Sequence, residues 1–436
     1  MILVAGNVAT AGDKVFPYRY YNKTLPNDLR VIVIPMASHG LVTYFSIVRT
    51  GSRDEVEPGK SGFAHFFEHM MFRGTKKYPQ AAYQRIVAGM GAHANAFTTD
   101  DFTAFHLSFA KEDLAKVAEI ESDRFQNLSY ENAAFQTEAG AVYGEYRKNI
   151  TQPFAQLEEK LSDRAYVAHP YKHTTIGFEA DIKRMPEAYE YSLTFFRRYY
   201  RPENVVLLIV GDVEVAPTFD VIEKYYGGWK TGYVAPQIPR EPPQTAPRSA
   251  EVSYPGATLP VLTIAYHGDR FDAANRDYVA ALLLGDLAFG STSAIHKRLV
   301  IHQQKVEFIE ADIPMNRDPS LFSVTAVVES AADLNSVRDA IDRTLEDFKT
   351  KPVDEKRLQD IKRQKKYAFL MELDSPEKVT QALARIIALT GGVAAVDQLY
   401  AAYQQVTAAD IQRAARKYFD PQQRTVVVLK GVGGRE

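Results

Sequence analysis

The segment FAHFFEHMMFRGT, residues 63–75, carries two histidines and one acid in the order H-x-x-E-H. His65 and His69 are four positions apart and share one face of a helix, because a helical turn takes about 3.6 residues. Glu68 lies beside that face. A hydrolytic zinc site uses imidazoles as ligands and a nearby carboxylate as general base. The segment therefore predicts a metal-binding helix, and a third ligand must come from elsewhere in the fold.

Two acids in FQTEAGAVYGEYRKNI, residues 135–150, are candidates for that third ligand. Glu138 and Glu145 are seven positions apart, about two turns, and share one face of a predicted helix. Two carboxylates on a packed face need a compensating charge, and a metal would provide it. Small side chains between them predict a close approach of this helix to another helix: Ala139, Gly140, Ala141 and Gly144.

The alternative interpretation is a solvated helix with two ordinary histidines. It does not explain the apolar neighbours of the motif, which indicate a buried helix where unpaired His and Glu would be costly. These neighbours are Phe63, Phe66, Phe67, Met70, Met71 and Phe72. Four other histidines, His93, His106, His169 and His173, are interpreted as structural or loop residues.

Composition narrows the class of protein. The chain has 436 residues, 46% of them hydrophobic, with 52 basic against 54 acidic residues and a net charge of -2. This balance gives no electrostatic reason to expect nucleic acid as a partner. The sequence has no run of about 18 apolar residues, so we expect no membrane-spanning helix. The absence of cysteine excludes disulfides and thiolate zinc ligands.

The N-terminal stretch bears on the compartment. Ala9-Thr10-Ala11 resembles an A-x-A cleavage site, and we expect a trimmed export signal there, although a basic n-region is lacking. The sequence leaves the compartment open between bacterial periplasm and cytoplasm.

The chain is predicted to contain two homologous domains. Residues 233–251 carry five prolines and are interpreted as an extended linker between domains at 1–232 and 252–436. The two halves close alike, with FFRRYYRPENVVLLIVGDV and AARKYFDPQQRTVVVLKGV, whose prolines Pro202 and Pro421 are 219 positions apart. We expect an α+β fold, in which each domain is a mostly antiparallel sheet flanked by helices.

Local patterns predict the elements around the motif. Residues 29–35, 41–51 and 261–268 have the β-branched runs of strands. Asn27-Asp28 favours a hairpin turn. Residues 93–109 are predicted to form a hairpin, and 111–127 an amphipathic helix.

SGFAHFFEHMMFRGT resembles the signature of the inverted-motif zinc metallopeptidases that include pitrilysin, insulin-degrading enzyme and mitochondrial processing peptidase. In this family the third ligand is a glutamate some seventy-odd residues after the second histidine, with another glutamate seven residues earlier. The resemblance implies Glu145, 76 residues after His69, as the third ligand of one zinc ion per chain. It implies Glu138 as a supporting catalytic acid and Glu68 as the general base.

The resemblance extends to GMGAHANAFTTDDFTAF, residues 89–105, and to HPYKHTTIG, residues 169–177. It implies that Asn95, Ala96 and Phe97 belong to an edge strand that pairs with a bound peptide, as in β-augmentation. The alternative is an ordinary protected edge. It also implies an endopeptidase that hydrolyses peptides or unfolded segments inside a closed chamber.

The second half departs from the family pattern. Active members carry an Arg and, seven residues later, a Tyr in a segment that corresponds here to GSTSAIHKRLVIHQQKVEF, residues 290–308. The Arg position falls on Val300 or Ile301, and the Tyr position on Glu307 or Phe308. We therefore expect the zinc-bearing subunit of a heterodimer whose homologous partner supplies the Arg/Tyr pair.

Two alternatives stay open. A homodimer would use one of three basic residues instead: Lys297, Arg298 or Lys305. A non-catalytic assembly or scaffold subunit of the same fold would explain the missing pair, but not the complete zinc motif.

Overall fold

The computed structural model describes residues 14–432, so the cleavage site expected at residues 9–11 lies outside the described part. The chain forms two compact units. The first comprises the chain up to Tyr146, His173–Ile238 and Phe369–Val396, and the second comprises Arg147–Lys172, Pro239–Ala368 and the chain from Asp397 onward. The predicted domains at 1–232 and 252–436 follow the sequence duplication and stay a prediction. Each compact unit instead contains segments from both halves of the chain.

The first unit is built on a six-stranded sheet in the order β1-β2-β6-β3-β5-β4. Its strands are β1 (Tyr21–Thr24), β2 (Arg30–Pro35), β3 (Leu41–Val48), β4 (His93–Thr98), β5 (Thr103–Ala110) and β6 (Val205–Gly211). The pair β2/β6 is parallel and the other pairs are antiparallel. The predicted turn at Asn27-Asp28 joins β1 and β2, and Asp28 has a φ of 65°.

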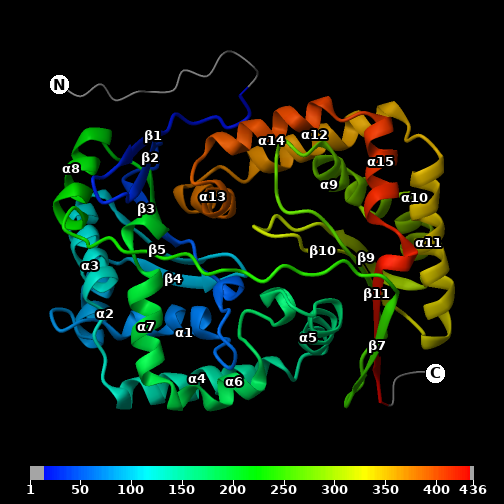
Figure 1. The fold of residues 1–436 in the computed structure, drawn as a ribbon. Coiled ribbons are helices and arrows are strands. Elements are labelled where there is room, and N and C mark those ends of the chain that lie inside the picture. Colours follow the sequence, from blue (N-terminus) through cyan, green and yellow to red (C-terminus); the bar gives the residue numbers. More distant parts are fainter. Residues whose placement is uncertain (1–13, 433–436) are drawn as a thin grey trace. The chain divides into compact units, whose positions relative to one another are not determined.

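Both faces of this sheet are covered. Every residue of β6 is buried, which requires packing on both sides of the strand. One face packs against α1 (Phe63–Met70) and α3 (Leu114–Asn127), and the ring of Phe105 in β5 meets Phe125 of α3. The other face carries α13 (Pro376–Thr390), which packs on β3 and β6 (Figure 1). Arg385 of α13 lies over the ring of Phe102.

The second unit repeats this design with a five-stranded sheet in the order β7-β11-β8-β10-β9. Its strands are β7 (Arg248–Tyr254), β8 (Val261–His267), β9 (Val306–Asp312), β10 (Leu321–Val328) and β11 (Arg424–Gly431). Only β7/β11 is parallel among the pairs of this sheet. The order matches β2-β6-β3-β5-β4 strand for strand, and the closing helices α7 (Tyr189–Tyr199) and α15 (Ala408–Tyr418) precede β6 and β11 alike. The prediction of a duplicated α+β fold is confirmed.

The remaining helices cover these sheets. In the first half they are α2 (Gln80–Gly89), α4 (Asn132–Asn149), α5 (Pro153–Ala165), α6 (Glu179–Arg184) and α8 (Val215–Tyr226). In the second half they are α9 (Arg276–Phe289), α10 (Ala294–His296), α11 (Leu334–Thr350), α12 (Glu355–Met371) and α14 (Ala394–Gln405).

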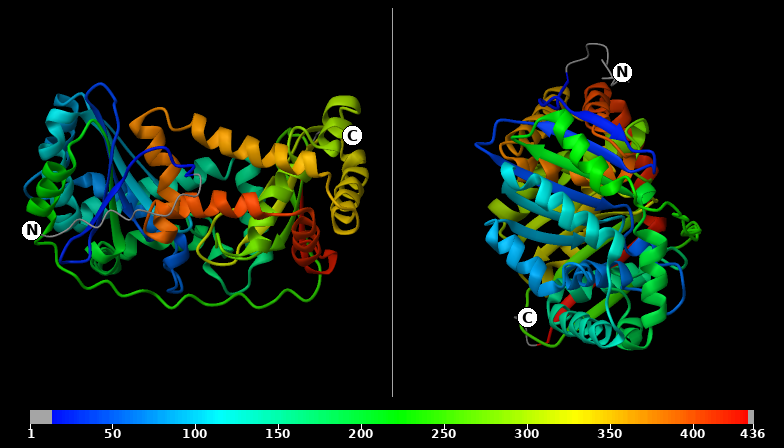
Figure 2. Two further views of the ribbon diagram at one scale, coloured as in Figure 1. Left: turned by 90° about the horizontal axis from the view of Figure 1, so that it is seen from above. Right: turned by 90° about the vertical axis from the view of Figure 1, so that its left-hand side faces the viewer.

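The proline-rich segment has no helix or strand before β7 begins at Arg248, and the left view of Figure 2 shows it as a plain trace. The prolines account for this form, since they remove backbone donors and fix φ.

One helical stretch, Arg276–His302, is long and apolar enough to cross a membrane by length and composition. However, 67% of its most apolar window is buried inside the structure, as in the core helix of a folded domain. The pair α13 and α14 passes the same test only as a span bent by 90°.

Candidate metal centre

The metal-binding motif forms α1, and its first turn is held by a buried acid. Glu55 accepts hydrogen bonds from the backbone N–H groups of Gly62 and Ala64, both at 2.6 Å. These N–H groups have no partner inside the helix, so the carboxylate acts as a cap. Gly62 has a φ of 90°, and a Cβ on Gly177 would lie 2.7 Å from the Gly62 nitrogen. The start of α1 is therefore held by the carboxylate of Glu55 and by close backbone packing against Gly177. We call these two contacts the clamp.

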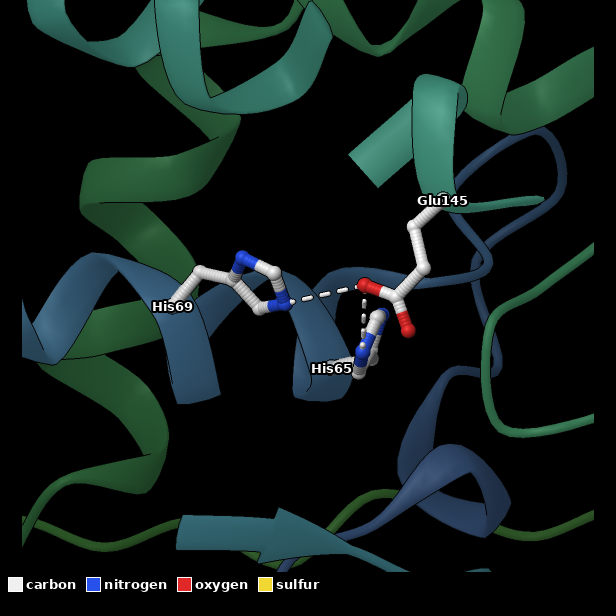
Figure 3. A group of neighbouring side chains, drawn as sticks. All are labelled: His65, His69 and Glu145. Atoms are coloured by element: carbon white, nitrogen blue, oxygen red, sulfur yellow. Dashed lines mark ion pairs between the residues drawn. The ribbon is translucent and has the colours of Figure 1, made fainter. Parts of the chain in front are cut away.

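The structure brings the two histidines and one of the two candidate acids together (Figure 3). Oε2 of Glu145 lies 3.7 Å from Nε2 of His65 and 3.3 Å from Nε2 of His69. One ligand atom from each residue lies within 4.8 Å of the others, and across residues 14–432 this is the one such group of three or more. Tetrahedral zinc with nitrogen and oxygen ligands at about 2.0–2.1 Å requires ligand atoms about 3.3–3.5 Å apart. The distance to His69 lies in this range, and the distance to His65 is slightly longer.

Glu138 does not join this group and instead binds His69 from the other side. Its Oε1 lies 3.0 Å from Nδ1 of His69. Because the carboxylate accepts a hydrogen bond here, Nδ1 carries a hydrogen, and Nε2 is the ring nitrogen left for a metal. Arg73 donates from Nε to Oε2 of Glu138 at 2.5 Å and forms an ion pair with it. A ligand histidine held by a carboxylate is the usual arrangement at zinc sites.

The pKa shifts describe an acid-rich site. Hydrogen bonds to Glu138 and Glu145 raise the pKa of His69 to about 9. Burial would raise the pKa of Glu138, but its hydrogen bonds from His69 and Arg73 outweigh burial and lower it. A metal ion bound to Nε2 of His69 would take the place of the proton held between these acids.

His65 is deeper in the site. Its side chain is buried, and burial lowers its pKa to about 4, so the imidazole is neutral. Neutral imidazole is the form that binds metals. Its Nδ1 is buried without a hydrogen-bond partner. Its other ring nitrogen, Nε2, faces Glu145. The donor set fits zinc.

Glu68 lies next to the metal group without belonging to it. Its Oε2 accepts a hydrogen bond of 2.6 Å from the hydroxyl of Thr98, at the end of β4. Burial raises the pKa of Glu68, which suits a carboxylate that must take up a proton during a reaction.

The predicted substrate residues lie on β4, the outermost strand of the first sheet. Cross-strand pairing of Asn95 with His106 and of Ala96 with Phe105 assigns their side chains to opposite faces. Ala96 lies on the face of α1, and Asn95 and Phe97 on the face of α13. The N–H of Ala96 donates a hydrogen bond to Oδ1 of Asn95 at 2.9 Å.

The segment that departs from the family pattern is helical and then extended. Val300 and Ile301 lie in a π-helical stretch, Lys297–His302, and Ile301 is 56% exposed. Glu307 and Phe308 lie in β9, where Phe308 stacks on Phe154. Lys305, one of the alternative basic residues, forms an ion pair with Asp333 at 2.5 Å.

One structural expectation is wrong. No helix packs closely against the glycines of α4, because a Cβ added to Gly140 or Gly144 would meet nothing within 4 Å. Both lie on the exposed side of the helix. Of the four small residues, only Ala139 is buried, beside Glu138.

Three neighbours of the site were not predicted: Arg73, Thr98 and Glu55. Arg73 follows the motif by four positions and could have been inferred as a partner for a buried acid. Thr98 and Glu55 carried no usable signal, because their partners are 30 and 7 to 9 positions away without a periodic relation.

Comparisons with known proteins bear on this arrangement. Residues 36–178 match the family model "Insulinase (Peptidase family M16)", and residues 188–365 match "Peptidase M16 inactive domain". The zinc protease PqqE of Helicobacter pylori is 26% identical over 419 residues, which cover 94% of this chain and 93% of that protein. Mitochondrial-processing peptidase subunit beta of Lentinula edodes is 24% identical over 413 residues, which cover 91% of this chain and 86% of that protein.

A solved structure agrees in fold. The crystal structure of a protease from Helicobacter pylori superposes with a TM-score of 0.88 at 27% identity, and the match covers 95% of this chain and 99% of that one. With both family models matched in order and the fold reproduced over nearly the whole length, the chain belongs to the M16 (insulinase) family of peptidases, as a two-domain member of the bacterial type.

Proposed function

We propose that this protein is a zinc-dependent endopeptidase that hydrolyses peptides or unfolded protein segments in a closed chamber. The observation that supports it most is the convergence of His65, His69 and Glu145, with Glu68 beside them. Each residue has a distinct role in the proposal. The first three hold one zinc ion, and Glu138 fixes the ring of His69.

Bound in this group, zinc would supply a Lewis acid that lowers the pKa of a water ligand to about 7. Glu68 accepts the proton of the attacking water and passes it to the leaving amine. The substrate pairs as an added strand with β4, through the backbone of Asn95, Ala96 and Phe97. For this pairing the side chain of Asn95 must release the N–H of Ala96.

The proposal includes a partner. No Arg or Tyr stands at positions 300–301 or 307–308, and neither the apolar side chains nor the carboxylate of Glu307 can donate to an oxyanion. A homologous subunit would supply that pair, in line with the relative named as a subunit of mitochondrial-processing peptidase. A homodimer that uses Lys297, Arg298 or Lys305 is the alternative arrangement.

Zinc content and cleavage of a quenched fluorogenic peptide mixture test the proposal together. We expect one zinc per chain and chelator-sensitive cleavage once a homologous subunit carrying the Arg/Tyr pair is added. Cleavage by the chain alone would remove the need for that partner. Zinc without cleavage in any combination of subunits would contradict the peptidase proposal.

A non-catalytic assembly subunit is the second candidate, and the missing Arg/Tyr pair is the observation that favours it. A non-catalytic subunit would have no use for Glu68 beside the metal group, held by the hydroxyl of Thr98. Full zinc loading with no cleavage, together with a stable complex that depends on this chain, would support it.

A further inference from the structure

We propose that Thr98 is a positioning residue for Glu68, and that it couples this carboxylate to the strand on which the peptide binds. The inference rests on the proposed function, because it assigns a role to a residue through the general base of that reaction. The observation behind it is the hydrogen bond of 2.6 Å from Oγ1 of Thr98 to Oε2 of Glu68.

The geometry leaves Glu68 dependent on this contact. Glu68 extends from α1 toward β4 while His65 and His69 face Glu145. A half-buried carboxylate with a single hydroxyl donor has one oxygen fixed and the other available for a proton. Without the hydroxyl, the side chain can adopt other rotamers, and a base displaced by about 1 Å loses much of its effect.

Thr98 is itself held rigidly. It pairs across the sheet with Thr103, and the N–H of Thr99 next to it closes the turn onto the carbonyl of Phe102 at 2.9 Å. The tip of this hairpin is bonded to the segment before α1: the N–H of Arg53 donates to the carbonyl of Asp100 at 2.8 Å. A Cβ on Gly51 would lie 2.3 Å from the carbonyl oxygen of Thr99. The hydroxyl is therefore presented by a fixed support.

The position of Thr98 has a functional consequence. It directly follows Asn95, Ala96 and Phe97 on the edge strand. A peptide that pairs with β4 lies on the same strand that orients Glu68, so one hydroxyl fixes the position of the base relative to the bound peptide. Thr98 thereby acts on turnover more than on binding.

Kinetics on three variants test this role, with the homologous subunit present if cleavage requires it. Thr98→Val keeps the shape but removes the hydroxyl, and we expect kcat to fall by about tenfold to a hundredfold, because a hydrogen bond to a charged group is lost. KM and zinc content stay within about twofold of the parent protein. Thr98→Ser keeps the hydroxyl and is expected to recover most of the lost kcat.

Thr103→Val is the matched control. Thr103 lies opposite Thr98, and its hydroxyl donates to the carbonyl of Thr50 at 3.0 Å, away from Glu68. We expect this variant to leave kcat unchanged. An equal kcat for Thr98→Val and the parent, or an equal loss in Thr103→Val, would overturn the inference.

A second measurement does not depend on activity. Urea unfolding of the full chain with saturating zinc is compared for Thr98→Val, Glu68→Ala and the double variant. We expect Thr98→Val to lower the unfolding midpoint in the parent but not in the Glu68→Ala background, while Thr103→Val lowers it in both. Additive shifts for Thr98 and Glu68 would overturn the inference. A zinc-loaded parent that cleaves nothing in any combination of subunits refutes the proposed function as well, whereas an active parent with additive shifts refutes this inference alone.

Discussion

At the scale of single residues, the site is defined by what each acid contacts. Glu138 and Glu145 share one face of α4, yet one meets Nδ1 of His69 and the other meets Nε2. The two acids therefore bind opposite edges of one imidazole ring. This arrangement decides the tautomer of the ring and so which nitrogen can bind a metal.

Replacing the proposed general base separates metal binding from turnover. Glu68→Gln is isosteric and lies outside the group of three donors. We expect zinc content to stay at one per chain while cleavage falls by about 10²–10⁴-fold, the usual contribution of a general base. Metal analysis and peptide cleavage on the same sample measure both. Retained cleavage would contradict the role of Glu68.

Removing the charge of Glu138 should weaken metal binding. Glu138→Gln loses the carboxylate that holds His69 and pairs with Arg73. We expect zinc affinity to fall by about 10–100-fold in competition with a chromogenic chelator. Thr137→Ala, at the neighbouring exposed position of α4, serves as the control and should not change the affinity. An affinity equal to that of the parent would show that Glu138 does not support His69.

At the scale of elements, the site depends on how α1 and α4 are held. The clamp at the start of α1 involves two glycines whose backbones are in close contact, Gly62 and Gly177. On α4 the glycines are exposed and have open space around them. Glycine is therefore required at one element and costly at the other.

Alanine substitutions should reveal this difference. Gly140→Ala and Gly144→Ala are each expected to stabilise the fold by about 0.5–1 kcal/mol, because glycine is a poor helix former. Gly177→Ala should destabilise it by about 1–3 kcal/mol, since φ is 97° and the new Cβ would meet the backbone of Gly62. Urea unfolding measures all three. Destabilisation by the α4 substitutions would mean that this helix face is covered.

At the scale of the whole molecule, the compact units do not coincide with the halves of the chain. One face of the sheet in the first unit is covered by α13, which comes from the second half of the chain. Arg49 at the end of β3 donates to the carbonyl of Ala388 at 2.7 Å, and Tyr18 donates to the carbonyl of Leu373 at 2.6 Å. In return, α5 from the first half packs on β7 and β11 of the second unit.

The N-terminal half should therefore not fold by itself. A fragment 1–238 lacks α13, whose buried residues include Val379, Leu383, Ile386 and Ile387. Each such side chain contributes about 1.5–3 kcal/mol when buried, and a domain is stable by only about 5–15 kcal/mol. We expect the fragment to show no cooperative unfolding. Co-expression with 239–436 should restore it, and cooperative unfolding of 1–238 alone would contradict the dependence on α13.

The sequence by itself determined the features that are periodic or local. Four-residue spacing aligns His65 with His69, seven-residue spacing aligns Glu138 with Glu145, and the repeated strand patterns predict two similar sheets. These relations follow from helix and strand geometry, which each segment encodes in its own side chains.

Only the tertiary structure decided the contacts between distant segments. It separated the roles of Glu138 and Glu145, brought Thr98 to Glu68, and placed Glu55 at the start of α1. It also leaves the glycines of α4 exposed and makes α13 part of the first unit. Such contacts depend on how many apolar side chains are buried together, a sum over the whole chain that no local pattern contains.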